Sequence, residues 1–489
     1  MERRTSPRER DRPGRSVPRL AERLARQIPF TGWHLRTRAP ARRRNVVYPL
    51  SASGGGRAAT YLFTAAQGSI RVQLRSSAVV RILACVLACG SAAALLNLHG
   101  QESLRPSIAG EQAAEERRRA LENQPYNVRL GPVNLLASTS LSVEWNDNVN
   151  LVEVGRQEDL ILRPQLDVYG FWPVTPQNSI NLTLGAGYAK YFNQPQYDRL
   201  IIRPGSELSF DIFVGDFKID LHDRFSYTHD PISQGSISGE AEFGGFYNTA
   251  GAEVDWDLNE MILSIGYDHY DFLSSTERYD YLTRHSDSVI ARATFLPQTA
   301  LRWGLETSGA LNDYDQHVLN DNRSYSFGAF LDWTVASQLS IQPRAGFVQY
   351  SFDSGGSVGN TPDTQSYYLS LRARHQMNEG ASQSIEAGRS LDLGINADLI
   401  ELWSVRYQAA LRIIRHVGVE PRLFYEHGRE SALTFSEAYD RFGVGLGFTY
   451  QLMEKLRTHL RYGLTIKNSD VALRDYTQHT VILGADYRF

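Results

Sequence analysis

The last nine residues of the chain read Val481-Ile482-Leu483-Gly484-Ala485-Asp486-Tyr487-Arg488-Phe489, and two kinds of residue alternate along them. One face of an extended strand would carry Val481, Leu483, Ala485, Tyr487 and Phe489, which are apolar or aromatic. The other face would carry Ile482, Gly484, Asp486 and Arg488. Because successive side chains of a strand point to opposite faces, this pattern predicts a strand between an apolar and a polar environment.

This terminal stretch resembles the C-terminal signal of bacterial outer-membrane β-barrels, in which the last strand ends on an aromatic residue. In that family the strand seals the barrel and is recognised by the barrel assembly machinery. The resemblance implies an assembly signal made of Val481, Leu483, Tyr487 and Phe489. Alternation over nine residues also arises by chance, so the prediction depends on the chain upstream.

Upstream, strand-like segments of roughly 10 to 15 residues alternate in the same way and are separated by turn residues. They begin near Leu136, Leu160, Ser179, Ile202, Phe217, Phe246, Met261, Arg284, Ala300, Asn322, Leu339, Thr364, Ser382, Leu399, Val417, Ala438, Leu456 and Thr477. The sequence therefore predicts an all-β fold, a transmembrane antiparallel β-barrel of about 18 strands, within the range 16–18. An even number of strands leaves the N- and C-termini of the barrel on the same side of the membrane.

The connections form a second pattern, because every second one is tight. The tight ones are 176–178, 215–216, 259–260, 297–299, 336–338, 378–380, 415–416 and 453–455, and longer polar ones such as 146–159, 230–244, 274–283 and 353–362 lie between them. Short periplasmic turns and long external loops are the outer-membrane arrangement. Tyrosine, phenylalanine and tryptophan near segment ends indicate aromatic girdles, and the chain has no run of 18 apolar residues for a spanning helix.

The N-terminal quarter carries different signals. Residues 1–78 are arginine-rich and aperiodic, which predicts disorder or a misassigned gene start. Residues 79–100 have the layout of a signal peptide, with cleavage near Ala94 and a mature chain from about residue 95–101. They hold both cysteines, so Cys89 leaves a lipoprotein as an alternative. Residues 101–130 are expected to form a periplasmic tether with a short helix, before a barrel over 131–489.

Placing the apolar row of each strand against lipid leaves charged side chains inside. The second half of the barrel is expected to line a pore with basic residues, namely Arg344, Arg372, Arg374, Arg406, Arg412, Arg422, Arg441, Arg457, Arg461 and Arg488. The first half is expected to line it with acidic residues, namely Asp167, Glu207, Asp211, Asp220, Glu253, Asp255 and Asp257. Opposed basic and acidic walls would orient dipolar solutes in a hydrated channel.

Arg–carboxylate ladders between neighbouring strands are the alternative reading of the same residues, since Glu420, Glu426 and Asp486 lie among the arginines. Side chains cannot fill an 18-strand barrel, however, so some water-filled space should remain. Gly443, Gly445 and Gly447 share one face of a late strand, where they could thin the wall or admit another side chain.

Sequence signals for catalysis or a cofactor are weak. The chain contains no HExxH or P-loop spacing, and its one GxSxG match, at 355–359, lies within the polar connection 353–362 and not between a strand and a helix. Its histidines, including His222, His229 and His427, are dispersed. We expect no enzyme activity, no cofactor and no metal. An N-terminal nucleic-acid-binding arm is also disfavoured, because arginine is abundant along the whole chain and lysine is rare.

The opening of the barrel carries a second resemblance. Leu130-Gly131-Pro132-Val133, then 141–149 (LSVEWNDNV) and 159–164 (DLILRP), look like a loosely defined group of porin-like barrels, some encoded with exopolysaccharide or exosortase systems. The motifs cover residues 130–197 and are structural, so they imply a pore or an export conduit and transfer no site residue.

Three hypotheses follow for a Sec-exported protein of the bacterial outer membrane. The first is a channel for passive diffusion of hydrophilic, anionic solutes. The second is an exopolysaccharide export barrel, in which the arginines contact an acidic polymer and a loop such as 230–244 or 353–362 forms a lid. The third is a closed structural barrel without transport. Membrane lipid and the barrel assembly machinery are expected partners of all three.

Overall fold

The computed structural model describes residues 126–298, 300–433 and 435–489. The arginine-rich extension, the signal segment and the short helix expected from the sequence lie outside this part. The strands are β1 (Val128–Leu130), β2 (Val133–Asn146), β3 (Asp159–Pro173), β4 (Ser179–Tyr191), β5 (Arg199–Val214), β6 (Phe217–Thr228), β7 (Gly245–Asp257), β8 (Met261–Ser274), β9 (Arg284–Gln298), β10 (Leu301–Tyr314), β11 (Asn322–Ala336), β12 (Leu339–Phe352), β13 (Thr364–Asn378), β14 (Ala381–Leu393), β15 (Leu399–Ile414), β16 (Val417–Ser431), β17 (Ser436–Met453), β18 (Leu456–Ser469) and β19 (Tyr476–Arg488). Three short 3₁₀ helices lie in connections, η2 (Pro195–Tyr197), η3 (Pro231–Ser233) and η4 (Glu277–Leu282).

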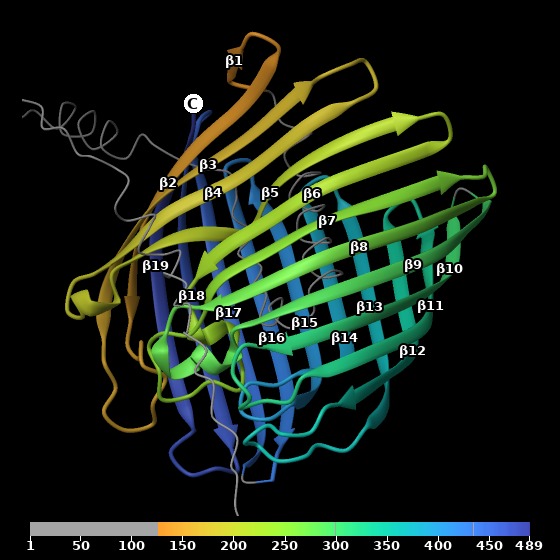
Figure 1. Cartoon of the computed structure of the whole chain (residues 1–489). Helices are drawn as coiled ribbons and strands as arrows, with labels where there is room; N and C mark the ends of the chain where they lie inside the picture. The colour runs from red at the N-terminus through yellow and green to blue at the C-terminus, as the bar shows by residue number, and fades with distance from the viewer. Residues whose placement is uncertain (1–125, 299, 434) are drawn as a thin grey trace, which may run out of the picture. The chain divides into compact units, whose positions relative to one another are not determined.

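Strands β2 to β19 form a closed antiparallel barrel of eighteen strands (Figure 1). Each strand pairs with the next along the chain, and β19 closes the ring on β2 with a register that runs from Thr480 opposite Asn146 to Arg488 opposite Ser138. The fold predicted from the sequence is therefore confirmed. Every barrel strand begins within three residues of its predicted start, because alternation and turn residues are local signals.

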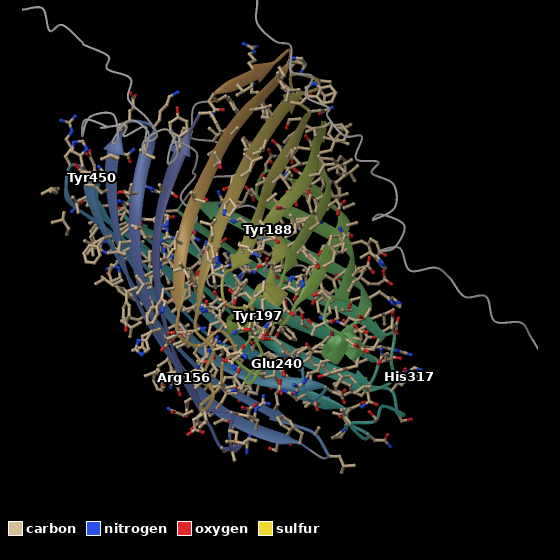
Figure 2. The ribbon with its side chains drawn as sticks, turned by 90° about the vertical axis from the view of Figure 1, so that its left-hand side faces the viewer. Arg156, Tyr188, Tyr197, Glu240, His317 and Tyr450 are labelled. Carbon is tan, nitrogen blue, oxygen red and sulfur yellow. The ribbon has the colours of Figure 1, made fainter. Side chains whose placement is uncertain are left out.

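Short and long connections lie at opposite ends of the barrel, which we call the turn end and the loop end (Figure 1). Tyr450 lies at the turn end, and Arg156, Glu240 and His317 lie at the loop end (Figure 2). The turn end also holds β1, a strand absent from the prediction, which pairs with the start of β2 through a turn at Gly131. No helix in the described part of the chain is long and apolar enough to cross a membrane.

Strand β5 contains a register shift against both of its neighbours, between Ile202 and Ser206 on the β6 side and opposite Thr183 to Ala186 on the β4 side. Gly205 lies in this shift with φ of 80°. Glycine reaches that region without a Cβ clash, which explains the residue at this position. Arg203 lies within this shift on the inner row of β5, where it meets Asp167.

The outer rows of the strands are apolar and end in aromatic residues. On β17, Phe442, Val444, Leu446 and Phe448 are all exposed. At the turn end we define the turn-end girdle as two stacked pairs, Phe217 with Trp256 and Phe295 with Trp303, whose ring centroids are 5.6 and 4.4 Å apart. Such an apolar outer surface fits a lipid bilayer. The closed ring fits it as well, because it has no edge strand whose unpaired backbone N–H and C=O groups would cost free energy in lipid.

Candidate functional site

The inner row of each strand is identified by register from one strand to the next. On β17, the inner row contains Arg441, whose guanidinium contacts Glu426 of β16 and the backbone oxygen of Ile232 in the β6–β7 connection. Residues directly opposite one another on paired strands point to the same face. Glu426 is opposite Arg441, and Phe424 on the same row is opposite Arg406, so the inner row can be followed from β17 to β16 and β15 and on around the barrel. Alternation therefore assigns every strand residue to the interior or to the outer surface.

All the charged residues selected from the sequence occupy inner-row positions. These are the basic Arg344, Arg372, Arg374, Arg406, Arg412, Arg422, Arg441, Arg457, Arg461 and Arg488 and the acidic Asp167, Glu207, Asp211, Asp220, Glu253, Asp255 and Asp257. Their role in lining a water-filled pore stays a prediction. The four assembly-signal residues lie on the outer side of β19 and at its end, where Leu483 and Phe489 are exposed.

On the arginine-rich side, one carboxylate holds two guanidinium groups. Glu426 is 2% exposed and lies 2.9 Å from Nη2 of Arg406. Nε of Arg441 donates to its second oxygen over the same distance. Other pairs join neighbouring strands, Arg372 with Glu386 at 2.6 Å and Arg457 with Asp486 at 3.0 Å. The ladder expected as an alternative is therefore present in the wall.

Most of the predicted acidic residues are also paired, with basic side chains that were not among the predicted pore-lining residues. Arg203 meets Asp167 at 2.8 Å, Arg224 meets Glu207 at 3.2 Å, Arg292 meets Glu253 at 3.4 Å and Lys218 meets Asp211 at 3.3 Å. His222 lies between the carboxylates of Asp220 and Asp268, at 2.7 and 2.9 Å. The alternation along each strand is enough to predict that these side chains face inward, but which of them pair depends on the register between strands.

After pairing, the two sides of the barrel still differ in their numbers of basic and acidic inner-row residues. The inner rows of β12 to β19 contain eleven basic residues, the ten selected arginines and Lys467, and seven acidic ones, Glu386, Asp392, Glu420, Glu426, Glu430, Glu437 and Asp486. The inner rows of β2 to β11 contain eight basic residues, Arg163, Arg199, Arg203, Lys218, Arg224, Arg284, Arg292 and Arg302, and twelve acidic ones, Glu144, Asp159, Asp167, Glu207, Asp211, Asp220, Glu253, Asp255, Asp257, Asp268, Glu306 and Asp332. The two sides thus carry net charges of opposite sign, which produces a field across the interior.

The β6–β7 connection, residues 229–244, crosses the interior to the opposite wall. The Ser236 hydroxyl donates to Glu430 of β16 at 2.8 Å, and Lys467 of β18 donates to the Ser238 hydroxyl at 3.0 Å. Gly239 donates its backbone N–H to Leu151 in the β2–β3 connection at 2.9 Å. We call residues 229–244 the crossing segment. It narrows the barrel near the loop end.

A buried ion cluster lies beneath the far end of the crossing segment. The ammonium group of Lys467 is 2.8 Å from Glu437, and Arg474 lies 2.9 Å from the other oxygen of Glu437. Both Lys467 and Glu437 side chains are wholly buried. Arg474 also donates to the backbone oxygen of Ser236. The Lys467–Glu437 pair is thus shielded from water, while Arg474, with a side chain 20% exposed, links the pair to the crossing segment.

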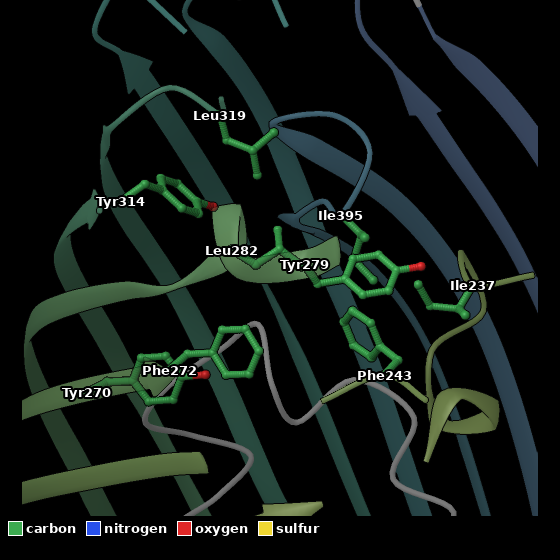
Figure 3. Close-up of a cluster of buried hydrophobic side chains, with 9 residues drawn as sticks. All are labelled: Ile237, Phe243, Tyr270, Phe272, Tyr279, Leu282, Tyr314, Leu319 and Ile395. Carbon is green, nitrogen blue, oxygen red and sulfur yellow. The ribbon is translucent and has the colours of Figure 1, made fainter. Parts of the chain in front are cut away.

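Four loop-end connections meet in one apolar cluster (Figure 3). Ile237 and Phe243 of the crossing segment pack with Tyr279 and Leu282 of η4, Leu319 of the β10–β11 connection and Ile395 of the β14–β15 connection. The inner-row residues Tyr270, Phe272 and Tyr314 form the side of the cluster nearest the wall. The predicted loop 353–362 contributes Val358, which packs against it. Hydrophobic burial thus fixes these connections together inside the mouth.

At the root of the crossing segment, His229 is 7% exposed and packs edge-on against Tyr227, with ring centroids 4.5 Å apart. Burial and the nearby charge of Arg199 lower the pKa of His229 to about 4. The ring is therefore neutral at neutral pH, and the segment begins without a charge at this buried position.

Among the three glycines of β17, Gly443 is the one at which the packing of a neighbouring side chain requires glycine. The ring of Phe424 on β16 lies over it, and a Cβ at this position would overlap the ring. Of the two readings left open by the sequence, the one in which another side chain packs close therefore applies at Gly443. Gly445 and Gly447 lie beside Arg422 and Glu420 at ordinary or slightly tight distances.

Toward the turn end, the inner wall contains a cavity of about 450 Å³. Arg374, Arg422 and Glu420 line it. The rest of its polar lining is mostly serine hydroxyls and glutamine amides, with Thr334 and His375 beside them. This side of the barrel is therefore hydrophilic. In the described part of the chain, no group of three or more His, Cys, Asp or Glu side chains is arranged to hold a metal ion.

Comparison with known proteins gives a likeness of fold. No protein-family model matches the chain, and no curated protein matches it. Among solved structures, OpdO of Pseudomonas aeruginosa aligns at 13% identity and a TM-score of 0.42, over 73% of this chain and 97% of that one. OccK2 (OpdF) of the same organism aligns at 11% and 0.44, over 74% and 98%. A BenF-like porin from Pseudomonas fluorescens Pf-5 aligns at 10% and 0.43, over 73% and 98%.

Proposed function

We propose that this protein is an outer-membrane channel through which hydrophilic anionic solutes diffuse passively. The observation that carries the proposal is the charged inner wall, in which ten arginines on β12 to β19 face a more acidic β2 to β11. A barrel of eighteen strands is too wide for side chains to fill, so water and solute occupy the remaining interior. The excess positive charge on one side would concentrate anions there.

In this proposal the turn end faces the periplasm and the loop end faces outward, as in other outer-membrane barrels. Export through the signal segment 79–100 delivers the chain to the periplasm, and the terminal strand is recognised by the barrel assembly machinery. The crossing segment then forms a constriction on the external side, and the cavity beside Arg374 and Arg422 opens on the periplasmic side.

Two alternatives each have an observation in their favour. The inward position of residues 229–244 favours an export barrel for an acidic exopolysaccharide, in which this segment is a lid. The pairing of most inner-row charges with a neighbour, as at Glu426, favours a closed structural barrel. A structural barrel would lose stability when its arginines are replaced but would show no change in permeability.

Solute uptake by proteoliposomes tests the channel against both alternatives. We expect liposomes containing the purified protein to swell faster in gluconate than in glucose, and faster in glucose than in glucosamine, because these solutes are similar in size and differ in charge. Replacing Arg374 and Arg422 by glutamine should reduce the gluconate rate toward the glucose rate. Equal rates for all three solutes in the wild type would contradict anion preference, and no swelling at all would support a gated or closed barrel.

A further inference from the structure

The outer surface of β6 to β9 contains polar side chains at levels where most outer-row positions of the barrel are apolar. Asp223 lies on β6, Asn248 on β7, Tyr267 and His269 on β8, and Asp287 on β9. We call these five residues the polar seam. Their outer position follows from register, since Asp223 is opposite Leu208 on β5 and Ala250 on β7, which are both exposed.

The seam residues bond to one another. The Asn248 amide donates to the Asp223 carboxylate at 2.5 Å. The Tyr267 hydroxyl donates to Asp287 at 2.6 Å, and Nδ1 of His269 lies 2.8 Å from the same carboxylate oxygen. The side chains of His269 and Asp287 are each 40% exposed. Polar groups with remaining hydrogen-bonding capacity are thus presented on a surface that elsewhere meets lipid.

The depth of Asp223 in the apolar band separates it from the other charged outer residues. It lies six residues beyond Phe217 of the turn-end girdle, which corresponds to about 15 Å along the membrane normal for a strand tilted by about 40°. The apolar band of such barrels is about 25 Å tall, so the carboxylate lies inside it. In the described strands, no other outer-row carboxylate lies so close to the turn-end girdle. Lipid headgroups at either surface do not extend to this level.

A second triad on the far side of the barrel shows that the upper part of the seam alone is not distinctive. Tyr425 donates to Asp440 at 2.8 Å, and His427 lies 3.0 Å from the same carboxylate. This triad repeats the arrangement of Tyr267, His269 and Asp287 near the loop end. Its strands continue toward the turn end with exposed apolar residues, including Leu423 and Val444. The Asp223–Asn248 pair has no counterpart on that side. Lipid tails therefore suit the turn-end half of β16 and β17, whereas the same level of β6 and β7 requires a polar partner.

We infer that the outer face of β6 to β9 packs against a second copy of this chain in the membrane. Small side chains, Ala250 and Ala252 on β7 and Ala291 and Ala293 on β9, leave hollows on either side of the exposed Ile265 of β8, into which a second barrel can pack. Copies in one membrane share an orientation, so they are related by an axis along the membrane normal. That axis brings the β6–β7 edge of one copy against the β8–β9 edge of the next at the same height.

This arrangement is chemically self-complementary. The β6–β7 edge presents the Asp223 carboxylate. The β8–β9 edge presents Nε2 of His269 as the donor, because Nδ1 of His269 and the Tyr267 hydroxyl are already bonded to Asp287. His269 lies eight residues beyond Met261, about 5 Å higher than Asp223, a difference that side chains can span. A lipid tail offers no hydrogen-bond donor to a carboxylate, whereas a second barrel offers the His269 imidazole.

Cysteine cross-linking in outer membranes tests this interface. In the full chain with Cys85→Ser and Cys89→Ser, we introduce Ala250→Cys together with Ala291→Cys, one on each side of the seam. The matched control is Ala345→Cys together with Ala387→Cys, which lie on outer rows of β12 and β14, also two strands apart. Oxidation should produce covalent oligomers from the first pair and only monomers from the control. Monomers from both pairs, or equal cross-linking by both, would overturn the inference.

The variant Asp223→Leu distinguishes an interface from a lipid-facing surface independently of cross-linking geometry. If a second copy covers Asp223, its replacement in the Ala250→Cys, Ala291→Cys chain should reduce the yield of oligomers severalfold. If Asp223 faces lipid, leucine should leave the yield unchanged and raise the temperature at which the barrel unfolds in gel-shift assays. Asp440→Leu, on the opposite side, is the control and should leave the yield unchanged.

Discussion

Removal of the crossing segment is expected to raise the single-channel conductance severalfold. The variant replaces residues 231–242 by a short Gly-Ser linker, which can close the gap because Thr228 and Gly245 are opposite one another in register. Conductance increases with the open cross-section of the narrowest part of a pore, and this segment spans the interior to β16 and β18. Single-channel recording in planar bilayers measures the change.

The barrel should survive this deletion because the wall beneath the segment keeps its own contacts. Arg441 remains bonded to Glu426, and Lys467 remains bonded to Glu437. The control removes residues 153–156 from the β2–β3 connection, which are exposed at the same end of the barrel. That deletion should leave the conductance unchanged. Identical conductances for the wild type and the 231–242 variant would show that the segment does not limit the pore.

The substitution Glu426→Gln is expected to destabilise the barrel by about 3 kcal/mol, at the lower end of the usual cost of breaking a buried ion pair. Glu426 is almost wholly buried and accepts bonds from two guanidinium groups, so the variant leaves two cations close together without their counter-ion. The side chain of Arg406 is 33% exposed, and its contact with water keeps the cost from being larger. Urea unfolding in detergent, followed by tryptophan fluorescence, measures the difference.

Glu386→Gln is the matched control for this prediction. Glu386 is also an inner-row carboxylate bonded to one arginine of the wall, but its side chain is 38% exposed and that of Arg372 is 25% exposed. Water screens such a pair, so the expected loss is below about 1 kcal/mol. A similar loss in both variants would mean that burial does not determine the strength of these pairs.

Most of the barrel could be predicted from the sequence because its signals are local. The alternation of apolar and polar residues gives each strand and its two faces, and the tight connections give the turns. The parity of a residue within its strand then places Arg372 or Glu207 on the inner row without any knowledge of the neighbouring strand. Strand β1 was missed because three residues, Val128–Leu130, are too short to show a period.

The contacts inside the barrel could not be predicted in the same way, since they depend on register and on loops that meet far from their own strands. Arg203 on β5 reaches past β4 to Asp167 on β3, a partner that only the register of three strands identifies. Ser236 and Glu430 are 194 residues apart in sequence and are brought together only by closure of the ring. The sequence indicated that a long loop could fold inward, but the residues that bind it on the far wall carry no local signal of that role.

We propose that the arginine-rich wall borders a water-filled path that favours anions. The most direct test is the reversal potential of the purified protein in a planar bilayer separating two concentrations of KCl. We predict a steady conductance whose reversal potential shows that chloride is more permeant than potassium. We predict that this preference is lost when four arginines of the wall are changed to glutamate, namely Arg372, Arg374, Arg406 and Arg461. A folded barrel that conducts no current, or one that prefers potassium, would rule out an anion-selective channel.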